Sequence, residues 1–484
     1  MRPTAIRFAR LHLPAVLLLT GALAGCASVR PEVALADVRA TLDGRTVHRT
    51  VWVTGAAEDA EARAAVARLL ADSLTAEAAV QVALLNNRHL QATYETLGLA
   101  QAQLVQAGLL GNPVFGAGAL WPLDGGPPEW RFRVASDFLD VLYRPLRRAV
   151  ARGQYEAARL RAASAVLELE AETRAAFVRA QADAARLGAQ RRVVASAEAG
   201  YAASRLLREA GNVPMLDVLA EQALFEEARL GLALAEAQAE ESREALVRLM
   251  GLSGPDAHVR PAGALPPVPP EAPYLTGDVL DVAALERAAV EASLALGATR
   301  ADVLAAARAV GLAVPESALP NLSVGAELEG RPGDWEAGPE VGLRLPLFDT
   351  GQARRAAARS VLREQQARYE ALAVDVRSAA RSLAVRLAAA RRTALHYQTT
   401  VLPLRARLVQ ETLLQYNAMQ VGVFHLLQAQ QLEAEAARRY FDALAAYWTA
   451  RADLGALLAG YAPNLGRGGL VLAPAGGTAR LDPH

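Results

Sequence analysis

The sequence predicts a mainly α-helical protein that carries a smaller amount of membrane β-structure and is built from two internal repeats. Of the 484 residues, 52% are hydrophobic but only 5% are aromatic, and helix-favouring alanine and leucine dominate the apolar part. Two stretches of helical composition, Leu146–Ala210 and Gln352–Ala418, each run for about 65 residues or roughly 100 Å, which no compact domain contains. Short alternating runs of apolar and polar residues precede both stretches, as in membrane barrel strands.

Charge and composition exclude several classes of function. Lys+Arg and Asp+Glu both total 51, and this net charge of zero gives no field that would hold a nucleic acid, so we expect no nucleic-acid partner. One cysteine cannot form an intramolecular disulfide or a thiolate metal site. No glycine-rich phosphate loop follows a strand, no HExxH motif occurs, and the seven histidines are scattered. We therefore expect no enzyme, no cofactor and no metal site.

The N-terminus has the pattern of a signal peptide over residues 1–25. Three arginines precede the apolar run Leu13–Ala24, which is too short to span a bilayer permanently. The run ends in Leu23-Ala24-Gly25-Cys26, which resembles a bacterial lipobox. That resemblance implies acylation of Cys26, membrane lipid as a partner and, because Ala27 follows, delivery to the outer membrane. An ordinary signal peptide with an incidental cysteine is the alternative.

Landmarks that recur in the same order indicate an internal duplication. Leu219-Ala220-Glu221-Gln222 reappears as Leu427-Gln428-Ala429-Gln430, and Leu139-Asp140 reappears as Phe348-Asp349, both at an offset of about 208 residues. The boundaries that we expect are 1–25 for the signal peptide, 26–74 for a lipidated N-terminal segment, 75–250 for repeat 1, 251–277 for a stiff proline-rich linker, 278–460 for repeat 2 and 461–484 for a flexible glycine-rich tail.

In repeat 1 three helices are expected. The first covers Thr75–Leu110 and ends at Gly111-Asn112-Pro113, which are helix-stop residues. The second is the long helix Leu146–Ala210, and the third is a returning helix over Met215–Met250. The first and third helices each have about 36 residues, so together they nearly equal the long helix. We expect them to stack end to end alongside it.

Between the first helix and the long helix of each repeat, two short runs alternate between apolar and polar residues. They flank the turn Pro122–Pro128 in repeat 1 and the turn Gly330–Asp334 in repeat 2. Such alternation suits strands with one face in lipid, although soluble hairpins are the alternative. The apolar sets are Trp130, Phe132 and Val134; Leu322, Val324, Ala326 and Leu328; and Val341, Leu343 and Leu345.

Repeat 2 follows the same plan. Helical composition covers Asp278–Leu312, the long stretch Gln352–Ala418 and a returning helix over Val423–Gly460. Apolar residues in the long stretch alternate spacings of three and four, as in a coiled-coil seam. Pro403 interrupts this stretch and should kink or locally unwind the helix.

Four short motifs connect this order of elements to a known family. They are Leu84-Leu85-Asn86-Asn87-Arg88, Pro346–Gly351, and the two helical turns Gly211–Leu219 and Tyr416–Leu427. With them the chain resembles the TolC-like outer membrane factor family of efflux and export channels, in its lipoprotein type. The resemblance implies a homotrimer in which a 12-stranded outer-membrane β-barrel continues into an α-helical barrel through the periplasm. It also implies a passive conduit that works with an inner-membrane pump and a periplasmic adaptor protein.

The resemblance places candidate aperture residues in the two helical turns at the periplasmic tip. Asp217 falls at the acidic position of repeat 1, His425 at the matching position of repeat 2, and Gln428 lies one turn further on. A solvated helix cap and a surface turn are the alternative interpretation of these residues.

A second class of function competes with the channel. A structural or adhesive coiled-coil lipoprotein of the outer membrane would have the same long helices without conducting anything. The two strand pairs favour the channel, because a pure coiled coil has no use for them. Four strands cannot close a barrel in lipid, whereas three chains supply twelve.

Overall fold

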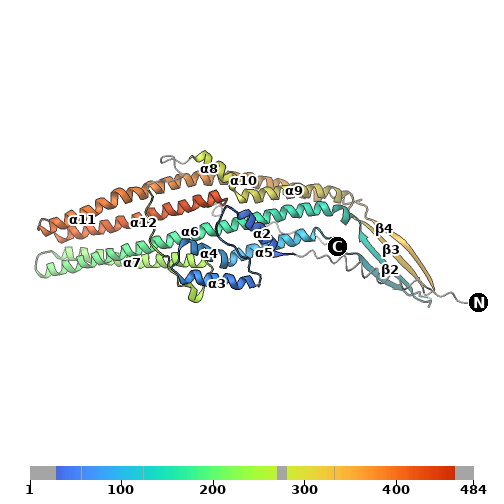
Figure 1. Ribbon diagram of the computed structural model, residues 1–484, viewed down its shortest axis with the longest axis horizontal. Coiled ribbons are helices and arrows are strands. Elements are labelled where there is room, and N and C mark those ends of the chain that lie inside the picture. Colours follow the sequence, from blue (N-terminus) through green and yellow to red (C-terminus); the bar gives the residue numbers. More distant parts are fainter. Residues whose placement is uncertain (1–28, 56, 124, 270–280, 332, 464–484) are drawn as a thin grey trace, which may run out of the picture.

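The computed structural model describes residues 29–55, 57–123, 125–269, 281–331 and 333–463. Over these residues the molecule is elongated, with helices along most of its length and one antiparallel sheet at one end (Figure 1). The predicted signal peptide and Cys26 lie outside the described residues, as do most of the linker's second half and the tail from residue 464.

The two halves of the chain have the same order of elements, which agrees with the predicted repeat. The first half contains α4 (Ala76–Asn86), α5 (Arg88–Gln106), β1 (Val114–Leu120), β2 (Glu129–Asp137), α6 (Leu139–Glu209) and α7 (Met215–Leu249). The second contains α8 (Val282–Ala292), α9 (Leu294–Ala318), β3 (Leu322–Arg331), β4 (Asp334–Leu343), α10 (Gln352–His396), the π-helical turn η2 (Tyr397–Val401), α11 (Leu402–Asn417) and α12 (Val423–Ala459). The N-terminal segment contains α2 (Pro31–Leu42) and α3 (Ala57–Ala71), and the linker begins with the 3₁₀ turn η1 (Gly254–Ala257).

The prediction of one continuous first helix in each repeat was wrong. Asn87 leaves the helical conformation and caps α5, because its side-chain oxygen accepts a hydrogen bond of 3.0 Å from the backbone N–H of Leu90. In repeat 2 the hydroxyl of Ser293 accepts the equivalent bond from Leu296. Asn and Ser are strong N-cap residues, so each begins a new helix at these positions.

The long helices agree more closely with the sequence. Helix α6 has 71 residues and begins at Leu139, seven residues before the predicted start, with Pro145 inside its second turn. The unwinding predicted at Pro403 is confirmed, because the π-helical turn η2 lies directly before it and separates α10 from α11. A proline lacks the backbone N–H that the regular helical ladder needs, which accounts for the local change of winding.

The helices form a layer in which α6 lies in the middle. Helices α5, α4 and α7 pack along one side of α6, while α9 and α12 pack along its other side and separate it from α10. The predicted stacking is therefore observed: α5, α4 and α7 follow one another along α6, and α9, α8 and α12 do the same along α10 (Figure 1). No helix in the described ranges is long and apolar enough to cross a membrane.

The four strands form one antiparallel sheet in the order β1-β2-β3-β4. Strands β2 and β3 come from different repeats, and their register places Arg131 opposite Glu329 and Arg133 opposite Glu327. The alternation predicted for β2 and β3 is confirmed. Strand β4 ends at Leu343, so Leu345 lies beyond the strand in which we expected it.

The two turns at the far end of the helices have the same backbone geometry but different residues. Gly211 has φ +76° and Met419 has φ +58°, and in both turns the next N–H bonds a carbonyl five residues back, from Asn212 to Leu207 and from Gln420 to Gln415. This is the Schellman motif, whose left-handed position normally belongs to glycine. Met419 therefore occupies a strained conformation with its side chain 94% exposed.

We predict opposite stability effects at these two positions. A left-handed non-glycine residue costs about 1–2 kcal/mol, and glycine costs about 0.4–1 kcal/mol of unfolded-state entropy. Met419→Gly should therefore stabilise the protein by on the order of 0.5–1 kcal/mol, and Gly211→Ala should destabilise it by a similar amount. A Cβ at Gly211 would meet no atom within 4 Å, so the Gly211→Ala effect comes from backbone conformation alone and not from a steric clash. Denaturant unfolding of both variants measures this, and shifts of the same sign would contradict it.

Candidate functional site

One face of the sheet is apolar and carries a cluster of aromatic rings. The ring centroid of Phe132 on β2 lies 6.4 Å from those of Phe115 and Trp130 and 6.2 Å from that of Trp335. Phe115 on β1 is 66% exposed and Trp335 on β4 is 45% exposed in the single chain. A surface of exposed aromatic and aliphatic side chains is unfavourable in water and suited to an apolar environment.

The other face carries every charged residue of the four strands. Arg131 forms ion pairs with Glu327 at 3.2 Å and Glu329 at 2.5 Å, and Arg133 pairs with Glu340 at 3.2 Å. Carboxylates outnumber arginines on this face by seven to three, so its net charge is negative. The carboxylates are those of Glu129, Asp137, Glu327, Glu329, Asp334, Glu336 and Glu340, and the arginines are Arg131, Arg133 and Arg331.

The predicted aperture residues lie at the opposite end of the molecule. The α6–α7 turn and the α11–α12 turn are both at the end furthest from the sheet (Figure 1). Asp217 lies in the first turn of α7 and is half-exposed, whereas His425 and Gln428 are exposed on α12. Among the described residues no hydrogen bond or ion pair joins Asp217 to either of the other two, so their role as an aperture stays a prediction.

Sequence reasoning missed Glu221, one turn after Asp217. Burial, and then the negative charge of Asp217, raise the pKa of the Glu221 carboxyl above its ordinary value. Glu221 lies against Gly200 of α6, where an added Cβ would come within 2.6 Å of its Oε2 and 3.1 Å of Leu427. The repeated Leu219–Gln222 motif contained Glu221, but only the packing of α7 and α12 on α6 shows that it is partly enclosed.

A cluster of charged side chains joins the N-terminal segment to repeat 1. His48 lies 3.0 Å from Glu77 of α4 and 3.5 Å from Glu170 of α6, and Thr46 donates a 2.7 Å hydrogen bond to Glu170. Arg174 of α6 donates to both oxygens of Glu77, at 2.5 and 2.8 Å, and also bonds Glu170. The sequence offered no pattern for this segment, because its partners are distant in the chain: Thr46 and Glu170 are separated by 124 residues. No group of side chains in the described ranges is arranged to hold a metal ion.

Electrostatics within this cluster favours ionised carboxylates. The hydrogen bond from Arg174 lowers the pKa of Glu77 despite partial burial. Burial acts to raise the pKa of Glu170, but hydrogen bonds from His48 and Thr46 and the charge of Arg174 outweigh it and lower the pKa. The cluster therefore stabilises the folded protein when both carboxylates are ionised.

Comparison with known proteins identifies the fold. A family model described as outer membrane efflux protein matches residues 146–252, which cover most of α6 and all of α7. The CmeC outer membrane channel of Campylobacter jejuni is 16% identical, with a TM-score of 0.67 over 80% of this chain and 86% of that chain. The outer membrane protein VceC of Vibrio cholerae is 18% identical, with a TM-score of 0.57 over 80% of this chain and 96% of that chain.

A third structure gives the same result. The MtrE outer membrane channel of Neisseria gonorrhoeae is 17% identical, with a TM-score of 0.54 over 80% of this chain and 89% of that chain. At such identities the likeness shows a shared fold, and no curated protein sequence matches the chain. The family match and the shared fold together confirm the resemblance and the fold class that the sequence predicted.

The charged cluster makes stability depend on pH in a defined direction. A carboxyl whose pKa is lowered on folding stabilises the protein above its unfolded pKa, and this contribution is lost as the pH falls through the folded pKa. Glu170→Gln should therefore destabilise the protein at pH 7 by about 1.5–3 kcal/mol, the range for hydrogen bonds to charged groups. The difference from the parent should shrink below pH 4.5, the ordinary pKa of the group.

Thermal unfolding of the parent and of Glu170→Gln at pH 7, 5 and about 3 measures this dependence. Glu198→Gln, at an exposed position of the same helix, is the matched control and should change little at any pH. A difference for Glu170→Gln that stays constant down to pH 3 would show that lost packing, and not charge, causes the destabilisation.

Proposed function

We propose that three copies of the chain form the outer-membrane channel of a tripartite efflux or export system and serve as its passive conduit. The observation that carries this proposal is the two-faced sheet at the end of a helical layer. A sheet with one apolar face and one charged face fits a wall between lipid and water. The long helices would continue that wall into the periplasm.

The open edges of the sheet support a trimer. Strands β1 and β4 each have one unpaired edge in the single chain. In lipid, unpaired backbone amides cost several kcal/mol each, so an open four-stranded sheet is not stable there. Pairing β4 of one copy with β1 of the next closes a barrel of twelve strands, within the range of known barrels.

Exposed apolar side chains at the two edges of the helical layer also support a trimer. Helix α7 at one edge and helices α10 and α11 at the other carry exposed aliphatic side chains that no element of the single chain covers. Exposed apolar surface of this extent is typical of an interface. The exposed residues are Leu216, Leu219, Leu230 and Leu234 on α7, Val361, Val374 and Val385 on α10, and Leu404 and Leu414 on α11.

In this arrangement the charged face of the sheet lines the lumen and the aromatic cluster meets lipid. The helical tips extend into the periplasm, where a periplasmic adaptor protein docks and connects the channel to an inner-membrane pump. The pump supplies the energy for transport. The rival function, a coiled-coil lipoprotein that conducts nothing, leaves the charged face of the sheet without a role.

Two measurements test the proposed channel: the mass of the solubilised particle and its conductance in planar bilayers. The detergent-solubilised protein should have the mass of three chains. In planar bilayers it should conduct ions with a preference for cations, because carboxylates outnumber arginines on the lumen face by seven to three. Replacing Glu129 and Glu336 by glutamine should weaken that preference. A monomer with full β-content and no conductance would favour the structural lipoprotein instead.

We propose that Asp217, His425 and Gln428 line the periplasmic aperture. A threefold axis brings three copies of each side chain together, so these side chains would set the charge and width of the aperture. Asp217→Asn and His425→Asn should therefore change conductance or ion selectivity, while His396→Asn, away from the tip, should not. If Asp217→Asn and His425→Asn both leave conductance and ion selectivity as in the parent, these residues are surface caps.

Cys26 is proposed to carry the lipid anchor. Its thiol is the only one in the chain, so Cys26→Ser should abolish labelling by a palmitate analogue. The variant should still reach the outer membrane if its signal is processed, because the sheet also holds the protein in lipid. Labelling that persists in Cys26→Ser would show that no acyl chain is attached at this residue.

A further inference from the structure

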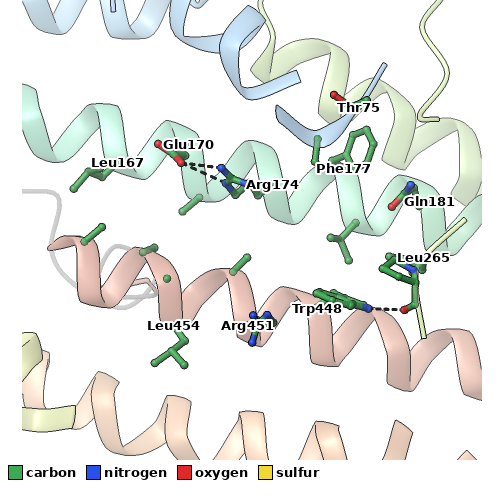
Figure 2. Close-up of a pocket in the computed structure, with 18 of the residues that line it drawn as sticks. Thr75, Leu167, Glu170, Arg174, Phe177, Gln181, Leu265, Trp448, Arg451 and Leu454 are labelled. Carbon is green, nitrogen blue, oxygen red and sulfur yellow. Dashed lines mark hydrogen bonds and ion pairs between the residues drawn. The ribbon is translucent and has the colours of Figure 1, made fainter. Parts of the chain in front are cut away.

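We propose that a cavity between α6 and α12 binds an anionic amphiphile, a single acyl chain with a carboxylate or phosphate headgroup. The cavity has a volume of about 640 Å³, within the range of small-molecule sites. Figure 2 shows the lining residues of both helices, with Glu170, Arg174 and Phe177 on α6 and Trp448 and Arg451 on α12. The cavity lies along the helices, between the sheet and the helical tips, and contains neither the charged face of the sheet nor the proposed aperture residues.

A strap of the proline-rich linker closes one end of the cavity. Gln181 of α6 donates a 2.6 Å hydrogen bond to the carbonyl of Ala262, and the indole N–H of Trp448 on α12 donates a 2.8 Å bond to the carbonyl of Pro266. The strap therefore connects α6 to α12. Leu265 between these two bonds is 8% exposed and lines the cavity.

Arg45 of the N-terminal segment closes the other end. Its Nη1 donates to the carbonyls of Ala292 and Ala459, both at 2.7 Å, and so caps the C-terminal ends of α8 and α12. Carbonyls at a helix C-terminus lack partners within the helix, which explains why a guanidinium binds there. The next residue, Thr46, donates a hydrogen bond to Glu170 of α6, so the N-terminal segment contacts both sides of the cavity at this end.

The wall between these ends is suited to an acyl chain. Most of its lining is apolar: α12 contributes four small residues beside Leu454, Leu458 and the Trp448 ring, and α6 contributes bulkier apolar side chains and Ala171. Apolar walls of this kind bind alkyl chains through the area that they remove from water. The small residues are Ala452, Gly455, Ala456 and Ala459, and the apolar side chains of α6 are Leu167, Phe177 and Val178.

The charges of the lining select an anionic headgroup. Three arginines, Arg45, Arg174 and Arg451, line the cavity with one carboxylate, Glu170. Arg174 is ion-paired with Glu170 and with Glu77 next to the cavity, and the three arginines still exceed these two carboxylates. A guanidinium has five N–H donors in a planar fork, and both bonds of Arg45 to the helix ends come from a single nitrogen. The guanidinium of Arg451 lies 6.0 Å from the centroid of the Trp448 ring, beside the apolar part of the cavity. Carboxylate and phosphate are the groups that such forks recognise.

Binding is measured on the full chain in phosphatidylcholine nanodiscs, with empty nanodiscs as the background. Radiolabelled laurate and dodecyl phosphate should bind saturably at about one per chain, and dodecanol, which has the same chain without charge, should bind at least about tenfold more weakly. Arg451→Gln should remove most of that difference while leaving dodecanol unchanged. Ala456→Trp should weaken all three probes by filling the cavity.

Ala446→Trp, at an exposed position of the same helix, is the matched control and should bind as the parent does. Binding that equals the empty-nanodisc background, or that is unchanged in both Arg451→Gln and Ala456→Trp, would overturn the proposal. Mass spectrometry of the purified protein distinguishes the sources of the ligand, since a lysophospholipid indicates a membrane origin and a fatty acid a soluble one. Failure of the conduit would appear in conductance and leaves this binding measurement unaffected.

Discussion

The pairing of β2 with β3 is the contact on which the rest of the structure depends. These strands belong to different repeats, and Arg131 and Glu329, which they bring into hydrogen-bond contact, are separated by 198 residues. Because β2 leads into α6 and β3 follows α9, the register of this pair also helps to fix how α6 lies relative to α9. Two hairpins thereby become one four-stranded sheet, and two helical repeats become one layer.

The same register produces the chemical asymmetry of the sheet. Side chains alternate between faces with a period of two, so a shift of one residue would move the arginines and glutamates into the aromatic cluster. The ion pairs of Arg131 with Glu327 and Glu329 would be broken by such a shift, because Arg131 would then lie on the other face, so they help to specify which face of each strand is charged. A wall with one apolar and one charged face follows from this single alignment, and so does the role that we propose for it between lipid and water.

Away from the sheet, the two repeats are connected by segments that belong to neither. The N-terminal segment reaches repeat 1 through His48 and Thr46 and reaches repeat 2 through Arg45. The linker crosses from Gln181 to Trp448. Helices α6 and α12 also pack directly on each other, and the cavity lies between them with these polar contacts at its two ends.

The sequence by itself determined the length of the helices and the alternation of the strands, because both depend on residues that are near one another in the chain. Long tracts of helical composition rich in alanine and leucine specified α6 and α10, and Pro403 specified where the winding changes. The break at Asn87 was not foreseen, because helical composition continues on both sides and only a local side-chain bond begins the new helix. The order of the strands, the enclosure of Glu221 and the partners of His48 were decided by the tertiary structure alone. These features depend on contacts between residues far apart in sequence, whose geometry no local pattern encodes.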